Sequence, residues 1–210
     1  MDIFKIQGRT RLTGEIPVSG AKNAALPILA ATLLTRGKSL IKNVPLLSDT
    51  SFMCEILRVL GCGCLRESSE IAIDTDKELK PFGDYDIVRK MRASICVLGP
   101  LLARCGKVEV SMPGGCAIGD RPIDLHLRGL QELGAQIHLD NGYIVATAPN
   151  GLKGAEIFLG GPFGSSVLGT ANVAMAASLA EGTTVIECAA CEPEIADLCA
   201  MLNKMGAKIT

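Results

Sequence analysis

The sequence predicts an α/β protein made of three copies of one supersecondary unit. Each copy contains an apolar helix, a glycine, a short strand, a second helix, a Leu-Gly or Met-Gly pair and another strand. The glycines that follow the first helix of each copy are 69 and 76 residues apart: Gly37, Gly106 and Gly182. Those that follow the second helix are 73 and 72 residues apart: Gly61, Gly134 and Gly206. Such a period corresponds to a whole folding unit rather than to a short solenoid repeat.

The first unit is predicted to contain a helix, a strand and a second helix: Leu26–Leu34, Ser39–Val44 and Ser51–Leu60. In the second helix, apolar residues recur at i, i+3, i+4 and i+7, the spacing of one helix face: Met53, Ile56, Leu57 and Leu60. Ser48-Asp49 before it is a capping signal. The glycines that follow the helices suit the left-handed C′ position.

The second unit repeats this order with the helix Ile95–Ala103, the strand Lys107–Met112 and the helix Asp124–Leu133. Asn141-Gly142 then separates two apolar-rich runs, Gln136–Leu139 and Tyr143–Thr147, which predicts a β-hairpin. The third unit has the helix Val173–Ala180, the strand Thr183–Glu187 and the helix Glu194–Met205, which Pro193 opens. Each unit is therefore interpreted as strand, helix, strand, helix and hairpin. The chain stops at Lys208-Ile209-Thr210, inside the first strand of the third hairpin, so we expect a fragment of a longer protein.

Superposing the units aligns the starts of the first helices at Lys22, Arg92 and Val167–Leu168. Helix N-termini carry free N–H groups and a partial positive charge. If the units pack around a pseudo-threefold axis, these ends converge and attract a multiply charged anion such as a phosphorylated substrate. The residues alone leave open the alternative that Lys22 and Arg92 are ordinary solvated charges.

An insertion in the second unit is a candidate functional loop. The two glycines of a unit are 28 residues apart there and 24 apart in the other copies, and the extra residues lie in the glycine-rich run Pro113–Pro122. Cys116 lies in this run, five residues before Arg121. Nearby cations lower a thiol pKa and favour thiolate chemistry, but a cysteine can equally be a small buried residue.

Composition excludes several functional classes. With 21 basic and 22 acidic residues and 3% aromatic residues, the chain has no basic excess and no stacking platform for nucleic acid. At 48% apolar it is not disordered. Its apolar stretches, Ala24–Leu34 and Ala93–Ala103, are too short to span a membrane, and no signal peptide begins the chain. We expect a cytoplasmic protein whose nine cysteines are free thiols.

The remaining motifs are weak indications of function. Cys188-x-x-Cys191 has the spacing of a zinc or redox pair, but no second pair completes it, and a structural role is the favoured interpretation. His126 is interpreted as an incidental helix histidine rather than a residue that tunes the site. No cofactor and no metal are expected.

The chain resembles the UDP-N-acetylglucosamine 1-carboxyvinyltransferase family, the enolpyruvyl transferases of peptidoglycan synthesis. The resemblance rests on motifs that match in order and spacing along the whole chain: SGAKNAALP at 19–27, MRAS at 91–94, PGGC at 113–116, GxRPxDLH at 119–126, LAEGTT at 179–184 and EPE at 192–194. It implies an inside-out α/β barrel domain of three βαβαββ units, like EPSP synthase, truncated in the third unit. Residues 22–210 would form this domain, with units of about 22–80, 81–150 and 151–210, while strands in 1–21 would belong to a missing second domain.

The resemblance also implies the reaction. The 3′-hydroxyl of UDP-N-acetylglucosamine adds to phosphoenolpyruvate, and a tetrahedral intermediate then loses phosphate. Lys22 and Asn23 would hold phosphoenolpyruvate, and Arg92 and Arg121 would contact the bound substrates. The residues implied to bind the nucleotide are Arg121, Pro122, Ile123, Asp124, Leu125, Ser166 and Val167. Cys116 would act as general acid and as the thiol that fosfomycin alkylates.

The chain departs from the family pattern in three features, one of which is that Cys188 and Cys191 replace residues that are commonly Asn and Arg. Ser-Val-Gly-Ala-Thr is replaced by Ser-Val-Leu-Gly-Thr at 166–170, and the residues that the family draws from its second half are absent. We therefore expect no turnover by this chain alone. Two alternatives stay open: a non-catalytic nucleotide-sugar-binding module that works with a separate partner, and a thiol redox or zinc protein built on Cys188 and Cys191.

Overall fold

The computed structural model describes residues 3–83, 92–112, 123–162 and 164–210. The first unit begins with helix α1, which continues as the 3₁₀ helix η1, and ends with a hairpin. Its elements are α1 (Lys22–Ala31), η1 (Thr32–Leu34), β1 (Lys38–Ile41), α2 (Ser48–Val59), β2 (Gly63–Glu67) and β3 (Glu70–Asp74). The three strands form one antiparallel sheet in the order β1-β3-β2.

The second unit has the full predicted order. Its elements are β4 (Phe82–Gly83), η2 (Arg92–Val97), α4 (Leu98–Cys105), β5 (Lys107–Ser111), α5 (Asp124–Glu132), β6 (Gln136–Asp140) and β7 (Tyr143–Thr147). Strand β4 is parallel to β5, which requires the helical crossover between them. Asn141 and Gly142 both have positive φ, +46° and +83°, as a type I′ turn demands, so the hairpin prediction is confirmed.

The third unit differs most from its prediction. Its elements are β8 (Glu156–Phe158), α6 (Val167–Ala177), β9 (Val185–Glu187) and α7 (Pro193–Lys204). Helix α6 begins six residues before the predicted Val173 and ends before Ala180, because Ser166 caps its start and Ser178 turns its hydroxyl back to the Ala174 carbonyl. Residues 207–210 form no strand, so no part of a third hairpin is present.

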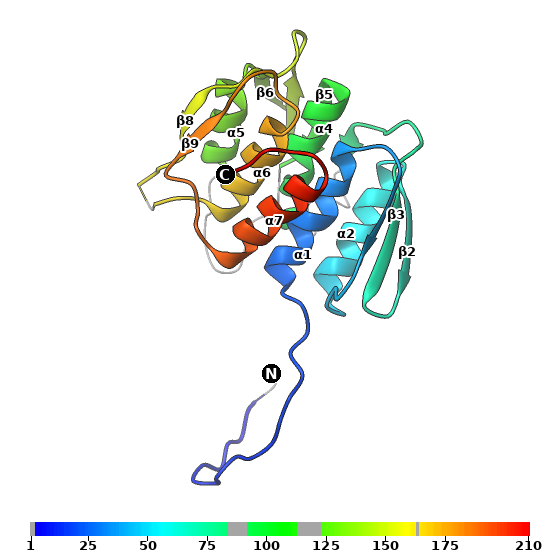
Figure 1. Cartoon of the computed structure of the whole chain (residues 1–210), viewed down its shortest axis with the longest axis vertical. Coiled ribbons are helices and arrows are strands. Elements are labelled where there is room, and N and C mark those ends of the chain that lie inside the picture. The colour runs from blue at the N-terminus through cyan, green and yellow to red at the C-terminus, as the bar shows by residue number, and fades with distance from the viewer. Residues whose placement is uncertain (1–2, 84–91, 113–122, 163) are drawn as a thin grey trace.

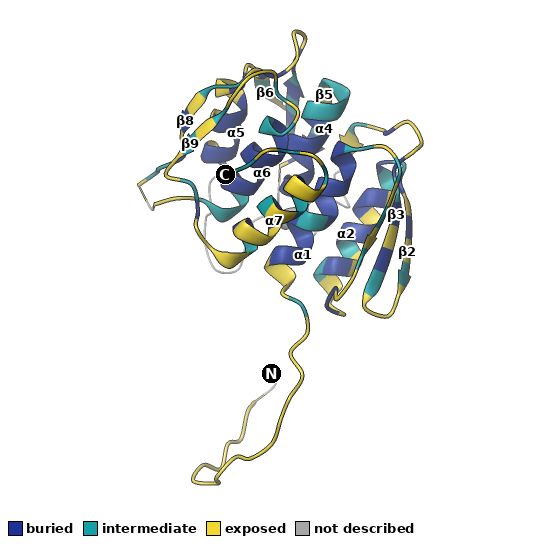
Figure 2. Ribbon diagram, viewed as in Figure 1, coloured by how far each residue is buried: buried dark blue, intermediate teal, exposed yellow. Residues whose placement is uncertain are grey.

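The first helices of the three units form the centre of the molecule, with the sheets outside them (Figure 1). Helices α1, η2 and α6 contact one another pairwise. Figure 2 shows α1 and α6 largely in the colour of buried residues. Four leucines of the central helices are fully buried: Leu29, Leu33, Leu98 and Leu101. The two apolar stretches are thus buried core helices, as predicted, and none of the described helices is long and apolar enough to cross a bilayer.

The three central helices run in the same direction, because they pack against one another pairwise and their C-terminal ends meet. Arg104, near the end of α4, donates from Nη1 to the carbonyls of Leu33 and Thr35 at the end of η1, at 2.8 and 2.6 Å. A cavity of about 160 Å³ is lined jointly by residues from the ends of η1 and α6: Leu34, Thr35, Ser178 and Leu179. The N-terminal ends of the same helices therefore lie together at the opposite end.

Residues 3–21 extend away from the rest of the chain and form no strand (Figure 1). Their large apolar side chains are almost fully exposed, with Phe4 at 96% and Val18 at 91%. Exposed apolar side chains in such a row indicate a surface that another part of a protein covers. The pairing of residues 1–21 with a second domain stays a prediction.

Candidate functional site

The candidate site is the end of the molecule at which the helices begin. Helix α1 starts at Lys22 and α6 at Val167, which confirms two of the starts that the repeat predicts. In the second unit, η2 begins at Arg92, directly after residues that the structure does not describe, so the predicted start there stays a prediction. The starts of η2 and α6 lie close together, because Nδ2 of Asn172 in α6 donates to the carbonyl of Ile95 in η2, and α1 contacts both elements. The backbone N–H groups of the first turns point out of each helix there.

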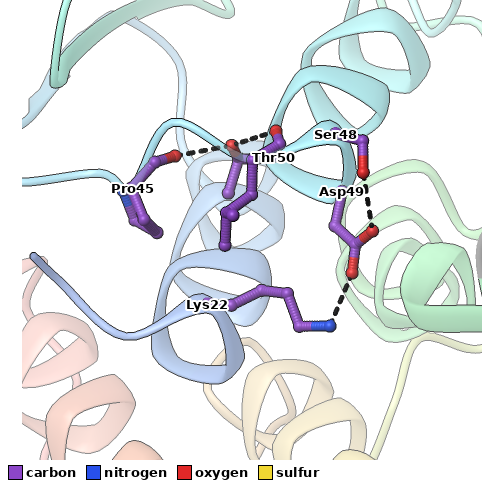
Figure 3. A network of polar contacts seen from close by, with 6 residues as sticks. Lys22, Pro45, Ser48, Asp49 and Thr50 are labelled. Atoms are coloured by element: carbon purple, nitrogen blue, oxygen red, sulfur yellow. Dashed lines mark hydrogen bonds and ion pairs between the residues drawn. The ribbon is translucent and has the colours of Figure 1, made fainter. Parts of the chain in front are cut away.

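Helix α2 begins at the same end. Lys22 Nζ lies 2.7 Å from Oδ2 of Asp49, in the first turn of α2 (Figure 3). The expected cap at Ser48 is wrong: Leu47 occupies the N-cap position, and the Ser48 hydroxyl turns to the Asp49 carboxylate instead. Asp49 thus holds the Lys22 ammonium beside two helix N-termini. Sequence reasoning missed Asp49 as a site residue, because its partner lies 27 positions away in the chain.

Helices α5 and α6 begin side by side. Leu125, in the first turn of α5, packs beside Gly161 and Gly169: a Cβ on these glycines would lie 3.4 and 3.6 Å from it, in ordinary van der Waals contact. The Ser166 hydroxyl accepts a hydrogen bond from the Gly169 amide at 3.1 Å. Ser166 is therefore the N-cap of α6. Its hydroxyl leaves the backbone amides of the first two helical residues, Val167 and Leu168, available to a ligand or to water.

The loop before α6 is fixed to α5 by Arg128, which sequence reasoning also missed. Its Nη2 donates to the carbonyls of Phe158 and Gly160, at 2.6 and 2.8 Å. Helix α7 joins the same end, because the amide of Ala190 donates to the Thr170 hydroxyl in the second turn of α6 at 3.0 Å. Among the elements that the structure describes, six helical ones thus begin at one end: α1, α2, η2, α5, α6 and α7.

This arrangement favours a multiply charged anion. Each helix start contributes unpaired N–H groups and a partial positive charge of about half a unit. Lys22, with 44% of its side chain exposed, adds a full cation that can turn from Asp49 to a ligand. The arrangement offers several donors to one phosphorylated molecule.

The structure brings together most of the predicted site residues that it describes. Asn23 and Asp124 are exposed, Ile123 and Leu125 are buried, and Ser166 and Val167 are half-buried. Arg92 starts η2. Cys116, Arg121 and Pro122 lie outside the described residues.

The described cysteines are free thiols, as predicted. Cys188 and Cys191 are exposed, and no group of three or more His, Cys, Asp or Glu residues is placed to hold a metal ion among the residues described. Burial raises the pKa of Cys62 to about 11 and that of Cys96 to about 12. The two buried thiols are therefore almost wholly protonated at neutral pH.

This contrast predicts selective alkylation. Iodoacetamide at pH 7.5 is expected to modify Cys188 and Cys191 within minutes and to leave Cys62 and Cys96 unmodified, because the raised pKa values remove their thiolates and burial blocks access. Peptide mass spectrometry after a timed quench measures this. Modification of Cys96 in the folded chain at a rate like that of Cys188 would contradict it, and urea-unfolded chain is the control in which all four react.

The Lys22–Asp49 pair predicts a gain of anion affinity. In the Asp49→Asn variant, inorganic phosphate is expected to bind about threefold more tightly, because the carboxylate no longer competes for the ammonium. Calorimetric titration at low salt measures the change, which 0.5 M salt should suppress. The matched control is Glu70→Gln, which breaks the exposed Lys42–Glu70 pair, 3.1 Å apart, and should leave phosphate affinity unchanged. Unchanged or weaker binding by Asp49→Asn contradicts the prediction.

Comparison with known proteins places the chain in a family. Residues 6–210 match the family described as EPSP synthase (3-phosphoshikimate 1-carboxyvinyltransferase). The chain belongs to the EPSP synthase family. Solved structures of this kind share its fold: the enolpyruvyl transferase NikO from Streptomyces tendae has a TM-score of 0.81 at 20% identity, covering 97% of this chain and 47% of that one. EPSP synthase from Acinetobacter baumannii has a TM-score of 0.72 at 20% identity, covering 94% of this chain and 44% of that one. The chain therefore has the inside-out α/β fold of these proteins.

Curated relatives are more similar in sequence. The UDP-N-acetylglucosamine 1-carboxyvinyltransferase of Methylacidiphilum infernorum is 56% identical over 210 residues, which is 100% of this chain and 49% of that protein. The enzyme of the same name from Akkermansia muciniphila is 50% identical over 209 residues, again 100% of this chain and 49% of that protein. The chain thus spans about half the length of the curated relatives it matches.

Proposed function

We propose that this chain is the N-terminal half of a cytoplasmic transferase that moves the enolpyruvyl group of phosphoenolpyruvate to UDP-N-acetylglucosamine. The observation that carries the proposal is the convergence of six helix starts with Lys22 at one end of the domain. Both substrates are phosphorylated, so both suit that end. The choice of substrates rests on the relatives that are 50–56% identical and bear that name.

The proposed chemistry has two steps. In the addition, the 3′-oxygen of the sugar bonds to C2 of phosphoenolpyruvate while C3 gains a proton, and the sugar hydroxyl loses its own. In the elimination, the bond from C2 to the phosphate oxygen breaks and C3 gives up a proton, which leaves an enolpyruvyl ether and phosphate. Cys116 would donate the proton to C3. The residues that take up the other protons would come from the missing half.

The other residues would bind the two substrates. Lys22 and Asn23, at the start of α1, would hold phosphoenolpyruvate. Arg92 and Arg121 would contact phosphate and carboxylate, as planar forked donors do. The start of α5 and the capped start of α6 would hold the nucleotide. Its diphosphate would accept hydrogen bonds from the first two backbone amides of α6, which the Ser166 cap does not use. No cofactor and no metal have a part in these steps.

Substrate choice within the family is the point to test. Saturation-transfer NMR with UDP-N-acetylglucosamine and with shikimate 3-phosphate, each at the same millimolar concentration, compares the two ligands directly on this chain. We expect signal transfer to the uridine and sugar protons and none to shikimate 3-phosphate. The reverse result would assign the chain to the 3-phosphoshikimate branch, and transfer to neither would overturn the proposal. UDP-glucose serves as the control for recognition of the N-acetyl group.

A further inference from the structure

A buried polar side chain, Asn172 on α6, joins three of the helices that begin at the candidate site. Asn172 is 0% exposed. Its Oδ1 accepts a hydrogen bond from the amide of Gly99 at 2.7 Å, and its Nδ2 donates to the carbonyl of Ile95, also at 2.7 Å. The same Nδ2 lies 3.0 Å from Nδ1 of His126, which is 1% exposed. One amide thus contacts η2, α4 and α5 as well as its own helix.

The two backbone partners determine how this amide is oriented. An amide N–H can only donate and a carbonyl can only accept, so Gly99 must face Oδ1 and Ile95 must face Nδ2. Nδ2 then also faces His126, whose Nδ1 must accept the second proton of the NH₂ group. The proton of the neutral imidazole is therefore on Nε2. A buried network in which both ends of the Asn172 amide have partners favours one arrangement of the packed helices over others.

The partners of Asn172 lie near the starts of their elements. Ile95 is three residues after the start of η2 at Arg92, and His126 is two residues after the start of α5 at Asp124. Asn172 itself is five residues after the start of α6 at Val167. The close approach depends on Gly99, because a Cβ there would lie 2.4 Å from the backbone oxygen of Asn172.

We propose that Asn172 is a positioning residue, which sets the relative position of the starts of η2, α5 and α6 and thereby the affinity for the nucleotide sugar. This inference rests on the proposed function for its ligand. Asn172 is fully buried, so it acts through the residues that it holds rather than by contact with substrate. Hydrogen bonds with fixed directions hold the helices to a register that apolar packing alone would leave adjustable.

A ligand-free measurement tests the positioning itself. In ¹⁵N–¹H spectra, Asn172→Ala is expected to shift the amide signals at the starts of η2, α5 and α6 and to leave those around Arg104 and Ser178, at the opposite ends, in place. In the wild type, the imidazole ¹⁵N signals of His126 should show an unprotonated Nδ1 and a protonated Nε2. Unchanged amides at the three starts, or a proton on Nδ1, would overturn the proposal.

Paired variants of His126 test the consequence for binding. The side-chain oxygen of asparagine takes the place of Nδ1, and that of glutamine takes the place of Nε2, so His126→Asn keeps the acceptor for Asn172 and His126→Gln loses it. We expect His126→Gln to weaken UDP-N-acetylglucosamine binding about tenfold and His126→Asn to restore most of that loss. Both are measured by titration well below the unfolding temperature, so that a merely structural effect does not enter.

Arg104→Leu is the matched control, because it removes the hydrogen bonds that join the opposite ends of the same helices. It should lower the unfolding temperature and leave the dissociation constant unchanged. Equal affinity for His126→Gln and wild type, or an equal loss in Arg104→Leu, would overturn the inference. If Asn172→Ala does not fold, the amide map of His126→Gln replaces it. If the wild type does not bind the nucleotide sugar, the proposed function fails, and the ligand-free map still decides the role of Asn172.

Discussion

Incubated with phosphoenolpyruvate and UDP-N-acetylglucosamine, the 210-residue chain is expected to release no phosphate above the blank. The chain spans 49% of the length of its curated relatives, and the resemblance assigns an acid that acts as base, with further basic residues, to the other half. On the proposed function, the sugar hydroxyl would then lack an acceptor for its proton, and the developing charges would lack partners. Losing a unit of catalytic groups lowers a rate by several powers of ten.

A coupled phosphate assay measures this over hours at micromolar protein. The full-length Methylacidiphilum infernorum enzyme in the same buffer is the positive control. Phosphate release by the purified short chain that depends on both substrates would contradict the expectation. It would mean that the residues of this half suffice for the chemistry.

Gly99→Ala should destabilise the chain by about 1 to 2 kcal/mol, although alanine is the better helix former. The helix propensity of alanine favours the variant by about 1 kcal/mol. Against this, the new Cβ would lie 2.4 Å from the backbone oxygen of Asn172 and 2.7 Å from its Oδ1. Helices α4 and α6 must then move apart, and such overpacking costs more than the propensity gain.

Urea unfolding followed by circular dichroism measures the loss. Gly129→Ala is the matched control: it is also a helical glycine, and its Cβ would lie 2.4 Å from an obstacle, but the obstacle is the Cγ2 methyl of Val173, a side-chain group. A smaller loss is expected there. A Gly99→Ala variant as stable as the wild type would show that the two helices do not approach as closely as described.

Aligning the three repeat units predicted the helix starts better than the local pattern of apolar residues did. Aligning the glycines predicted the starts of α1 and α6 at Lys22 and Val167, where the structure has them. Local apolar pattern began the last of these at Val173, since Gly169, Thr170 and Asn172 interrupt the apolar run. These three residues are buried within α6, where tertiary contacts outweigh their low helix propensity. The Asn-Gly pair alone was sufficient to predict the hairpin turn at Asn141-Gly142, because these residues readily adopt the positive φ values that the turn requires.

The polar contacts that organise the site could not be predicted from the sequence. Asn172 meets Gly99 and Ile95 across 73 and 77 residues, and Arg104 meets Leu33 across 71. No periodicity or motif marks such pairs, because they depend on how three separate units pack. His126 was interpreted as incidental for this reason. Asp49 carried a signal only as a first-turn acid, which does not name Lys22 as its partner.

The central claim is that the converging helix starts bind a nucleotide sugar, and one measurement tests it most directly. It is a ¹⁵N–¹H titration of the labelled chain with UDP-N-acetylglucosamine up to millimolar concentration. The account predicts amide shifts confined to residues at the starts of α1, η2, α5 and α6, including Asn23, Asp124, Val167 and Leu168. Absence of any shift, or shifts centred on the opposite end around Thr35, Arg104 and Ser178, would contradict it.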